Sequence, residues 1–337
     1  MDYSSSIADM TQELAGGVDS AEPAMLQEQV AQGNFTGLRQ FLARTRQSHD
    51  WQDRYFVLDL VGPSILQGSL NPLCATEPKS VDLSLIRGVH LLDLVSKSRG
   101  TKTADRTTEQ QMAQTAQYVK ATIASLRQAT QLDPADPTPY VFLMRSCQIF
   151  SDLHKHLHQS YGQAIQLAPD FVPAHFVMVN AQSKKWAGSH QQSLQVARAA
   201  MSHALPPSDA PACVFLAHLL VWQHVILFDK DHKRAQAYTS DREVVQELND
   251  AFDRWTQPPY RPRRSSLPYL HHAAYWYYQA GDRTRLQQAF AQTNGQLWDK
   301  AWNFAGDARK AHSCAVEFAS TGKKNTEKKS GLFGWLK

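Results

Sequence analysis

Apolar residues follow the helical repeat over most of this chain. Between Pro23 and Phe318 they recur every three or four positions, and the alternating runs bounded by turn residues that are typical of strands do not occur. The longest apolar run, residues 213–228, contains two histidines and a glutamine and is too short for a membrane span. We therefore predict an all-α fold with a buried helix at 213–228.

Short segments rich in proline, serine or charge interrupt this pattern. They lie at residues 71–80, 96–106, 205–212 and 256–268. None is long enough to require separate domains. We expect a flexible N-terminus over residues 1–22, a small helical module over 23–95, a helical-repeat domain over 107–320 and a C-terminal tail over 321–337.

Capping residues indicate where several helices begin and end. Ser240 and Glu243 match the S-x-x-E capping box, and Gly188-Ser189 can end one helix and cap the next. Helices are predicted near 138–149, 152–167 and 172–184, joined by short turns. Short connections of this kind produce antiparallel helix hairpins.

Internal repeats support the same architecture. The segment Gln131-Leu132-Asp133-Pro134 returns as Gln166-Leu167-Ala168-Pro169, which is 35 residues later. Five further positions follow one another with steps of 3, 4, 5 and 4 residues: Ala274, Tyr277, Gly281, Leu286 and Phe290. This order resembles the small, aromatic, glycine, apolar, aromatic pattern of a tetratricopeptide repeat. We expect tetratricopeptide-like helix hairpins that stack into an α-solenoid.

Several short segments carry a second resemblance. They are Arg99-Gly100, Leu132-Asp133-Pro134, Ala168-Pro169-Asp170 and Lys185-Trp186-Ala187-Gly188-Ser189. On these residues the chain from about 99 to 318 resembles an uncharacterised bacterial family of tetratricopeptide-like α-helical proteins. The family usually has Lys-Trp-Gly-Gly-Ser at the last segment, so Ala187 departs from it. The resemblance implies the fold and no activity.

The net charge of the chain comes entirely from its C-terminus. The net charge of the chain is +4, and residues 323–337 hold five lysines and one glutamate, which is also +4. Residues 1–322 therefore carry 30 basic and 30 acidic side chains, and a neutral body lacks the electrostatic signature of a nucleic-acid binder. The N-terminal residues show no signal-peptide pattern, and we expect a cytoplasmic protein.

Catalytic and metal-binding signatures are missing from the sequence. Glycine-rich nucleotide loops, the H-E-x-x-H zinc motif and the G-x-S-x-G nucleophile motif do not occur, and the four cysteines are scattered. His154 and His158 lie one helical turn apart, but Lys155 beside them would repel a cation, so we expect them to be structural or solvated. We predict no enzyme activity, no catalytic residue, no cofactor and no metal.

Two segments are candidates for partner binding. Trp186 beside a glycine turn could form the wall of a pocket, with Lys185 next to it and His175 as a polar companion, although a plug at a capped helix junction explains the segment too. Tyr277 belongs to the repeat core, whereas Trp276 and Tyr278 are expected to face neighbouring helices or the concave surface.

The C-terminal tail differs from the rest of the chain. After its lysines come four apolar residues that fall on one side of a short helix: Leu332, Phe333, Trp335 and Leu336. Three interpretations remain open. The tail folds back on its own body, docks into a groove of a partner, or touches an anionic membrane surface.

These observations favour a non-catalytic scaffold or adaptor. Helical repeats commonly hold peptides or proteins in a concave groove, and the tail would be a second contact. The alternative is a small-ligand-binding protein or enzyme with a pocket near His175 and Trp186. A third hypothesis is an immunity or chaperone partner of a neighbouring gene product.

Overall fold

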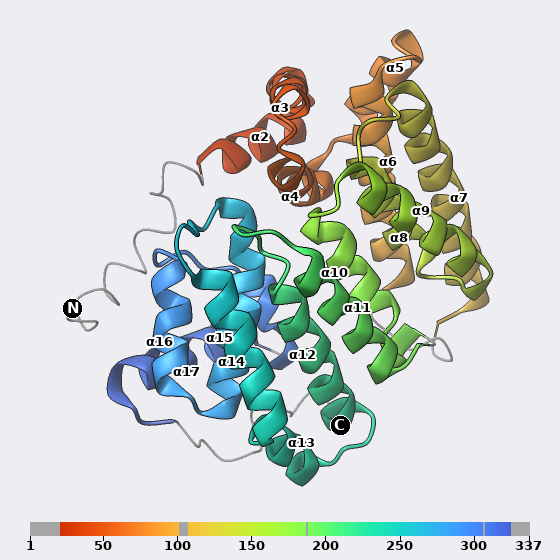
Figure 1. The fold of residues 1–337 in the computed structure, drawn as a ribbon. Coiled ribbons are helices and arrows are strands. Elements are labelled where there is room, and N and C mark those ends of the chain that lie inside the picture. The colour runs from red at the N-terminus through yellow and green to blue at the C-terminus, as the bar shows by residue number, and fades with distance from the viewer. Residues whose placement is uncertain (1–20, 101–106, 187, 306, 325–337) are drawn as a thin grey trace. The chain divides into compact units, whose positions relative to one another are not determined.

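The computed structural model describes residues 21–100, 107–186, 188–305 and 307–324, and these residues form helices and no strand (Figure 1). The predicted all-α class is confirmed. The described chain divides into two compact units between Met178 and Val179. We call residues 21–178 the N-terminal unit and residues 179–324 the C-terminal unit, and describe each separately. The tail residues from 325 onward and most of the predicted N-terminus lie outside the described residues.

The N-terminal unit is a series of helices joined by short turns. They are α2 (Ala21–Ala31), α3 (Thr36–Gln47), α4 (Trp51–Val61), the 3-10 turn η1 (Gly62–Ser64), α5 (Gln67–Thr76), α6 (Val81–Arg99), α7 (Glu109–Leu132), α8 (Thr138–Cys147), η3 (Ser151–Leu153) and α9 (His154–Leu167), and the unit ends within α10 (Val172–Ala181). The three predicted helices near 138–149, 152–167 and 172–184 are thus present. The break predicted at 71–80 is wrong in its first half, because α5 continues through Pro72 to Thr76.

Helices α6 and α7 pack closely along each other in this unit (Figure 1). Gly88 of α6 makes this approach feasible, since a Cβ atom there would lie 2.4 Å from Leu126 of α7. The Ser125 hydroxyl also donates a hydrogen bond of 2.9 Å to the Ser84 carbonyl. The predicted boundary between residues 95 and 107 therefore does not coincide with the division of the structure, because the helices on either side of that break pack together.

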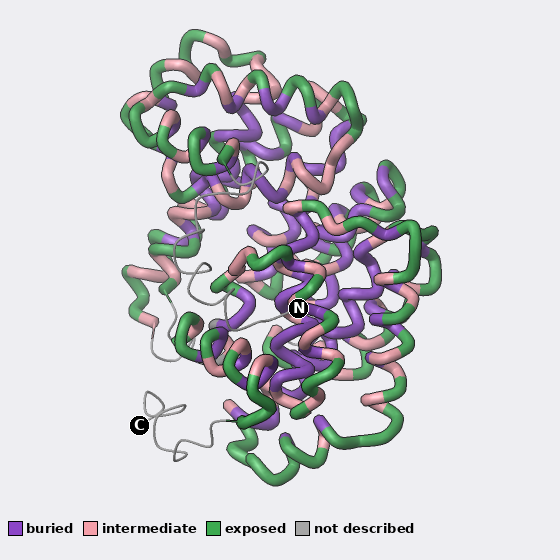
Figure 2. Tube along the Cα trace, turned by 90° about the vertical axis from the view of Figure 1, so that its left-hand side faces the viewer, coloured by how far each residue is buried: buried purple, intermediate pink, exposed green. Residues whose placement is uncertain are grey.

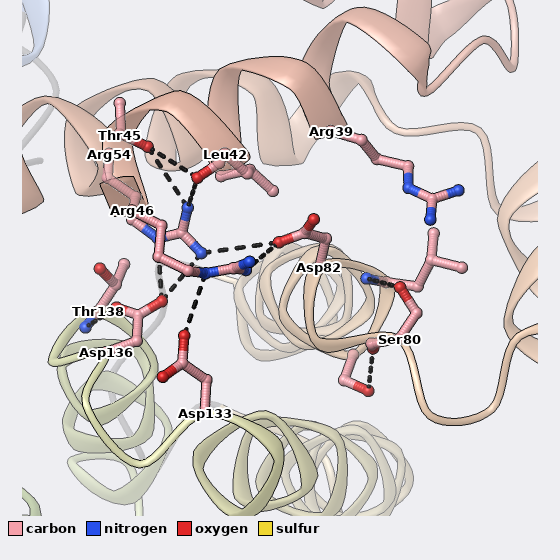
Figure 3. Close-up of polar contacts among 12 residues, drawn as sticks. Arg39, Leu42, Thr45, Arg46, Arg54, Ser80, Asp82, Asp133, Asp136 and Thr138 are labelled. Atoms are coloured by element: carbon pink, nitrogen blue, oxygen red, sulfur yellow. Dashed lines mark hydrogen bonds and ion pairs between the residues drawn. The ribbon is translucent and has the colours of Figure 1, made fainter. Parts of the chain in front are cut away.

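A buried ion pair joins α4 to the loop before α8 (Figure 3). The side chains of Arg54 and Asp136 are fully buried, and Nε of Arg54 donates to Oδ2 of Asp136 at 2.9 Å. A further guanidinium nitrogen of Arg54 donates to the Leu42 carbonyl at 2.5 Å. The other Asp136 oxygen accepts the backbone N–H of Thr138 at 2.8 Å. Paired and hydrogen-bonded on several sides, the two charges tolerate burial.

A second arginine extends this network towards α6 and α7 (Figure 3). Arg46 of α3 pairs with Asp82 of α6, and its Nε lies 3.0 Å from Oδ2 of Asp133. Asp82 also lies 3.8 Å from the guanidinium of Arg54. The network thus ties α3, α4, α6 and the α7–α8 connection together within the N-terminal unit.

The C-terminal unit begins in α10 and contains the rest of the described chain. Its elements are η4 (Lys184–Trp186), α11 (His190–His203), α12 (Ala212–Leu227), α13 (His232–Thr239), α14 (Arg242–Thr256), η5 (Arg264–Ser266), α15 (Leu267–Ala280), α16 (Arg283–Gln292), η6 (Asp299–Ala305) and α17 (Ala308–Thr321). Nearly all of α12 is buried, which confirms the predicted buried helix. Figure 2 shows the buried positions of the described chain in purple.

Aromatic rings and a histidine form the core around α15. Trp302 donates from Nε1 to Nδ1 of His271 at 3.0 Å, so Nε2 of His271 carries the hydrogen and donates to the Gln296 carbonyl at 2.8 Å. Rings of Phe290 and His312 pack against Trp302, with centroid distances of 6.2 and 5.1 Å. Burial lowers the pKa of His271 to about 3 and that of His312 to about 4, because a charged imidazole would lose its hydration there.

The helix ends follow the sequence in part. Ser189 caps α11 as predicted, accepting the backbone N–H of Gln192 at 3.1 Å. The capping box predicted at Ser240 is wrong, because Asp241 caps α14 instead, and the Ser240 hydroxyl donates to a carbonyl of α13. Gly281 ends α15 with φ of +75°, a conformation that favours glycine, and so makes the tight turn of the α15–α16 hairpin.

Candidate functional site

A surface pocket of about 450 Å³ lies among α13, α14, α15 and the start of α16 in the C-terminal unit. Its lining combines apolar surface with hydroxyl, amide and charged groups: Thr239, Ser240, Val245, Asn249, Trp276, Tyr277, Ala280, Gly281, Asp282 and Arg283. The turn at Gly281, one of the five positions of the predicted repeat pattern, therefore forms part of the pocket wall. We refer to this cavity as the Trp276 pocket.

Trp276 is a rigid part of this pocket. Its side chain is only 1% exposed and packs against the rings of His218 and Tyr238, with centroid distances of 5.9 and 6.0 Å. The sequence predicted that Trp276 would face neighbouring helices or a concave surface, and the structure places it against α12 and α13 at the pocket. Such packing fixes the indole, which supports the pocket while exposing almost none of its own surface.

Behind Trp276, four polar side chains form a hydrogen-bonded series that we call the polar chain: Tyr238, His218, Glu247 and Arg198. The Tyr238 hydroxyl lies 2.6 Å from Nδ1 of His218, and Nε2 of His218 lies 3.1 Å from Oε2 of Glu247. Arg198 binds both Glu247 oxygens, at 2.6 and 2.8 Å. Because a carboxylate can only accept, Nε2 of His218 donates to Glu247, while Nδ1 of the same ring is hydrogen-bonded to the Tyr238 hydroxyl.

The polar chain has the order of a catalytic triad, with a hydroxyl, an imidazole and a carboxylate. An activated nucleophile, however, needs a lowered pKa or a base ready to accept its proton. Burial raises the pKa of Tyr238, and hydrogen bonds from Arg198 and His218 lower the pKa of Glu247 to about 2. The tyrosine thus keeps its proton near neutrality. The arrangement supports helix positioning better than nucleophilic catalysis, since it joins α11, α12, α13 and α14.

A second pocket, of about 580 Å³, adjoins another face of α14. Its lining is mostly charged: Met201, Arg242, Glu243, Gln246, Glu247 and Asp250. Helix α14 with its capping residue holds five carboxylates, Asp241, Glu243, Glu247, Asp250 and Asp253, against two arginines, Arg242 and Arg254. Two of these carboxylates are already paired with arginines of other helices, Glu247 with Arg198 and Asp253 with Arg285. The charged lining of the Trp276 pocket itself is balanced, with Asp282 and Arg283.

His175 has a local role in the N-terminal unit. It is buried in α10, where Nδ1 lies 3.0 Å from the Tyr161 hydroxyl and Nε2 donates to the Pro169 carbonyl at 2.8 Å. Both ring nitrogens therefore bind groups of α9 and of the turn that follows it. This accounts for a polar residue at a buried helical position.

Lys185 and Trp186 lie in η4 of the C-terminal unit, in a different unit from His175. The Lys185 ammonium lies 5.5 Å from the centroid of the Trp186 ring, which is half-buried. Gly188 follows, and a Cβ atom there would lie 2.1 Å from the Gln182 carbonyl oxygen, so only glycine fits this close approach.

Tyr278 is buried on the side of α15 opposite Trp276, as its contacts show. Its ring packs against Trp302 and Phe318, with centroid distances of 6.4 and 6.1 Å, and the Lys324 ammonium lies 5.0 Å from it. Of the predicted partner-binding residues, Trp276 alone lines one of the two pockets described above. The predicted tail contacts, Leu332, Phe333, Trp335 and Leu336, lie outside the described residues.

Neither a metal centre nor a membrane span is found in the described part of the chain. There, no three or more histidine, cysteine, aspartate or glutamate side chains are grouped so as to hold a metal ion. Among the same residues, no helix is both long and apolar enough to cross a bilayer.

Comparisons with known proteins give no further guide. No family model, curated protein or solved structure matches this chain. The resemblance to tetratricopeptide-like proteins stays a prediction that depends on the segments named above.

Sequence reasoning missed most of the polar chain. Tyr238, Glu247 and Arg198 come from three helices and stand in surface-like sequence, so nothing in their local pattern marks them. His218 did carry a signal, because it interrupts the apolar run 213–228. A polar ring on an otherwise buried helix needs hydrogen-bonding partners, and these are found in the structure.

Proposed function

We propose that this chain is a non-catalytic binding protein whose Trp276 pocket takes an apolar side chain from a peptide or protein partner. The observation that carries the proposal is the pocket itself, with an indole held in place by the polar chain. The rings of Trp276 and Tyr277 are almost fully buried, so they support the pocket, and Val245 and Ala280 supply its accessible apolar surface. Preorganised pockets are typical anchoring sites for side chains of a partner. Asp282 and Arg283 at the rim could each pair with a charged side chain of the partner beside the apolar residue.

The wider setting of this proposal is a scaffold or adaptor. Under it, the α15–α16 hairpin belongs to a tetratricopeptide-like solenoid and the protein works in the cytoplasm, as the sequence predicts. The alternative, a small-ligand-binding protein or enzyme with a pocket near His175 and Trp186, has less support. His175 uses both ring nitrogens within its own unit, which leaves it no group for a ligand.

Selection from a displayed library of random peptides tests the proposal on the full chain. Ala280→Arg places a long side chain at a half-buried lining position at the end of α15. Ala291→Arg, at an exposed position near the end of α16, is the matched control. Selected peptides should bind wild type and Ala291→Arg equally and Ala280→Arg at least about ten-fold more weakly, as fluorescence polarisation would measure. Equal binding to all three proteins would refute the proposal.

A further inference from the structure

The described chain ends against the last turn of α15, on the side of Tyr278. The Lys324 ammonium donates to the Tyr278 carbonyl at 2.7 Å and to the Gln279 carbonyl at 3.0 Å. These carbonyls belong to the last turn of α15, and the next two residues of the chain, Ala280 and Gly281, line the pocket. The C-terminal tail therefore starts within a few residues of the pocket wall.

A lining residue also fixes the end of α17. Arg283 donates from Nε to the Ala319 carbonyl at 2.9 Å and from a terminal nitrogen to the Ser320 carbonyl at 2.6 Å. The same side chain thus contributes to the pocket and holds the last helical turn before the tail. The residue that lines the pocket therefore also positions the point at which the tail begins.

The tail is long enough to reach the pocket. Leu332 is eight residues after Lys324 (332 − 324 = 8). An extended chain of that length spans up to about 26–29 Å, since each residue adds at most about 3.3–3.6 Å. Lys324 contacts the last turn of α15 on the side of Tyr278. A helix with its side chains is about 10–12 Å across, so residues 332–336 can pass around α15 to the Trp276 pocket without full extension.

The tail also has the chemistry that the pocket favours. Residues 323–337 carry a net charge of +4. Of the five carboxylates on α14 and its capping residue, Glu247 and Asp253 are paired with Arg198 and Arg285, and the other three are Asp241, Glu243 and Asp250. Four large apolar residues follow those lysines: Leu332, Phe333, Trp335 and Leu336. An apolar anchor suits a preformed pocket, and the lysines before it can pair with Asp282 at the pocket or with carboxylates of α14.

We infer that residues 332–336 of the tail occupy the Trp276 pocket of the same molecule. The inference rests on the proposed function, because it assigns an occupant to the same pocket. A short tether gives the tail an effective concentration in the millimolar range, so an outside peptide must compete with it. A partner that binds this pocket would then release the tail.

A fluorescent synthetic peptide of residues 325–337 tests the inference on full-length chains. In the freed variant, Leu332→Ser, Phe333→Ser, Trp335→Ser and Leu336→Ser remove the apolar anchors while the tail keeps its length and charge. The control variant carries Asn325→Ser and Thr326→Ser. The peptide should bind the freed variant at least about ten-fold more tightly than wild type or the control variant. Adding Ala280→Arg to the freed variant should abolish this binding, whereas adding Ala291→Arg should not.

Several results would overturn the inference. The first is equal binding of the peptide to wild type and to the freed variant, and the second is binding to the freed variant that Ala280→Arg leaves unchanged. The third is a wild-type dimer that Ala280→Arg dissociates, because a second copy of the chain would then be the occupant. Flotation of wild type with anionic vesicles, lost in the freed variant, would assign the tail to a membrane instead. If library peptides still bind wild type and the freed variant equally, in a manner sensitive to Ala280→Arg, the proposed function stands and only the tail's role fails.

Discussion

In the N-terminal unit, the fully buried polar side chains include the charged pair Arg54 and Asp136, whereas the core of the C-terminal unit buries the imidazoles of His271 and His312 among aromatic rings. A buried ion pair depends on both partners being present, because either charge alone is strongly disfavoured inside a protein. A buried imidazole depends instead on staying neutral. The two units should therefore respond to different perturbations, one to loss of a partner and the other to acid.

Removing one member of the buried ion pair should have the largest effect. Arg54→Met leaves the Asp136 carboxylate buried without its guanidinium, and we expect a loss of about 3–5 kcal/mol in the free energy of unfolding. Urea unfolding followed by circular dichroism, with hydrogen exchange of α4 and α8 to locate the change, measures it. The double variant Arg54→Met, Asp136→Ala should cost less than the sum of the single changes.

The surface supplies a matched control for this prediction. Arg39 and Glu77 form an ion pair at 2.7 Å, but their side chains are 37% and 41% exposed. Arg39→Met should therefore cost no more than about 1 kcal/mol. Similar losses for Arg39→Met and Arg54→Met would contradict the distinction between the buried network and the surface pair.

Acid should destabilise the C-terminal unit more than the N-terminal unit. The unfolded chain has ordinary histidines with a pKa near 6.5, whereas His271 and His312 have lowered pKa values of about 3 and about 4. Below pH 6.5 the histidines of the unfolded state thus bind protons, whereas the same histidines in the folded state stay neutral. The free energy of unfolding therefore decreases as the pH falls towards those lowered pKa values. Each histidine should contribute a loss of about 2 kcal/mol between pH 7 and pH 5.

Tryptophan fluorescence reports this effect, because seven of the eight tryptophans follow residue 178. The N-terminal unit buries His175 and His90, and the pKa of His90 is also lowered by burial. We therefore expect a smaller acid effect there, which hydrogen exchange of α6 would measure. His312→Phe should reduce the pH dependence of the fluorescence-detected transition. An equal loss of stability in both units would break the comparison.

The polar chain contains a third kind of buried group, an imidazole whose two ring nitrogens are both hydrogen-bonded to side chains. Tyr238→Phe removes the hydroxyl that His218 binds at 2.6 Å and should cost about 1–2 kcal/mol, because it leaves a buried ring nitrogen without a partner. Thermal unfolding and peptide binding are the measurements. Tyr118→Phe, at a half-buried position on α7, is the control and should change stability by less than about 0.5 kcal/mol. No effect of Tyr238→Phe on either measurement would remove the positioning role assigned to the polar chain.

The smallest effects concern the caps. Asp241→Ala should destabilise α14 by about 1 kcal/mol, because its carboxylate accepts the N–H groups of Glu243 and Val244. Ser240→Ala, one residue earlier, should cost less, since its hydroxyl donates to a carbonyl of α13 and caps nothing in α14. Urea unfolding of the two variants decides between them. A larger loss for Ser240→Ala would favour the capping box that the sequence predicted.

Local features of the fold could be predicted, and long-range ones could not. Helical periodicity gave the helices near 138–149, 152–167 and 172–184 and the buried run 213–228, because each depends on neighbouring residues alone. The packing of α6 on α7 across residues 96–106 depends on Gly88 meeting Leu126, which no local pattern shows. The division between Met178 and Val179 falls inside α10, where the sequence has no break at all.

The candidate site shows the same limit. Trp276 was named from the sequence as a partner-binding residue, and the structure places it at a pocket. The groups that hold it there were not foreseen, because His218 is 20 residues from Tyr238 and 29 from Glu247 in the chain. Such contacts depend on how α12, α13 and α14 pack, and no local pattern in a single sequence predicts this packing.

The central claim is that a peptide binds beside Trp276, and site-specific cross-linking tests it most directly. A benzophenone amino acid replaces Val245, which lines the pocket, or Ala291, which lies on exposed α16 surface, and a library-selected peptide is added under light. The account predicts that the peptide cross-links to the chain substituted at Val245 and not to the chain substituted at Ala291. Equal cross-linking at both positions, or at Ala291 alone, would contradict it.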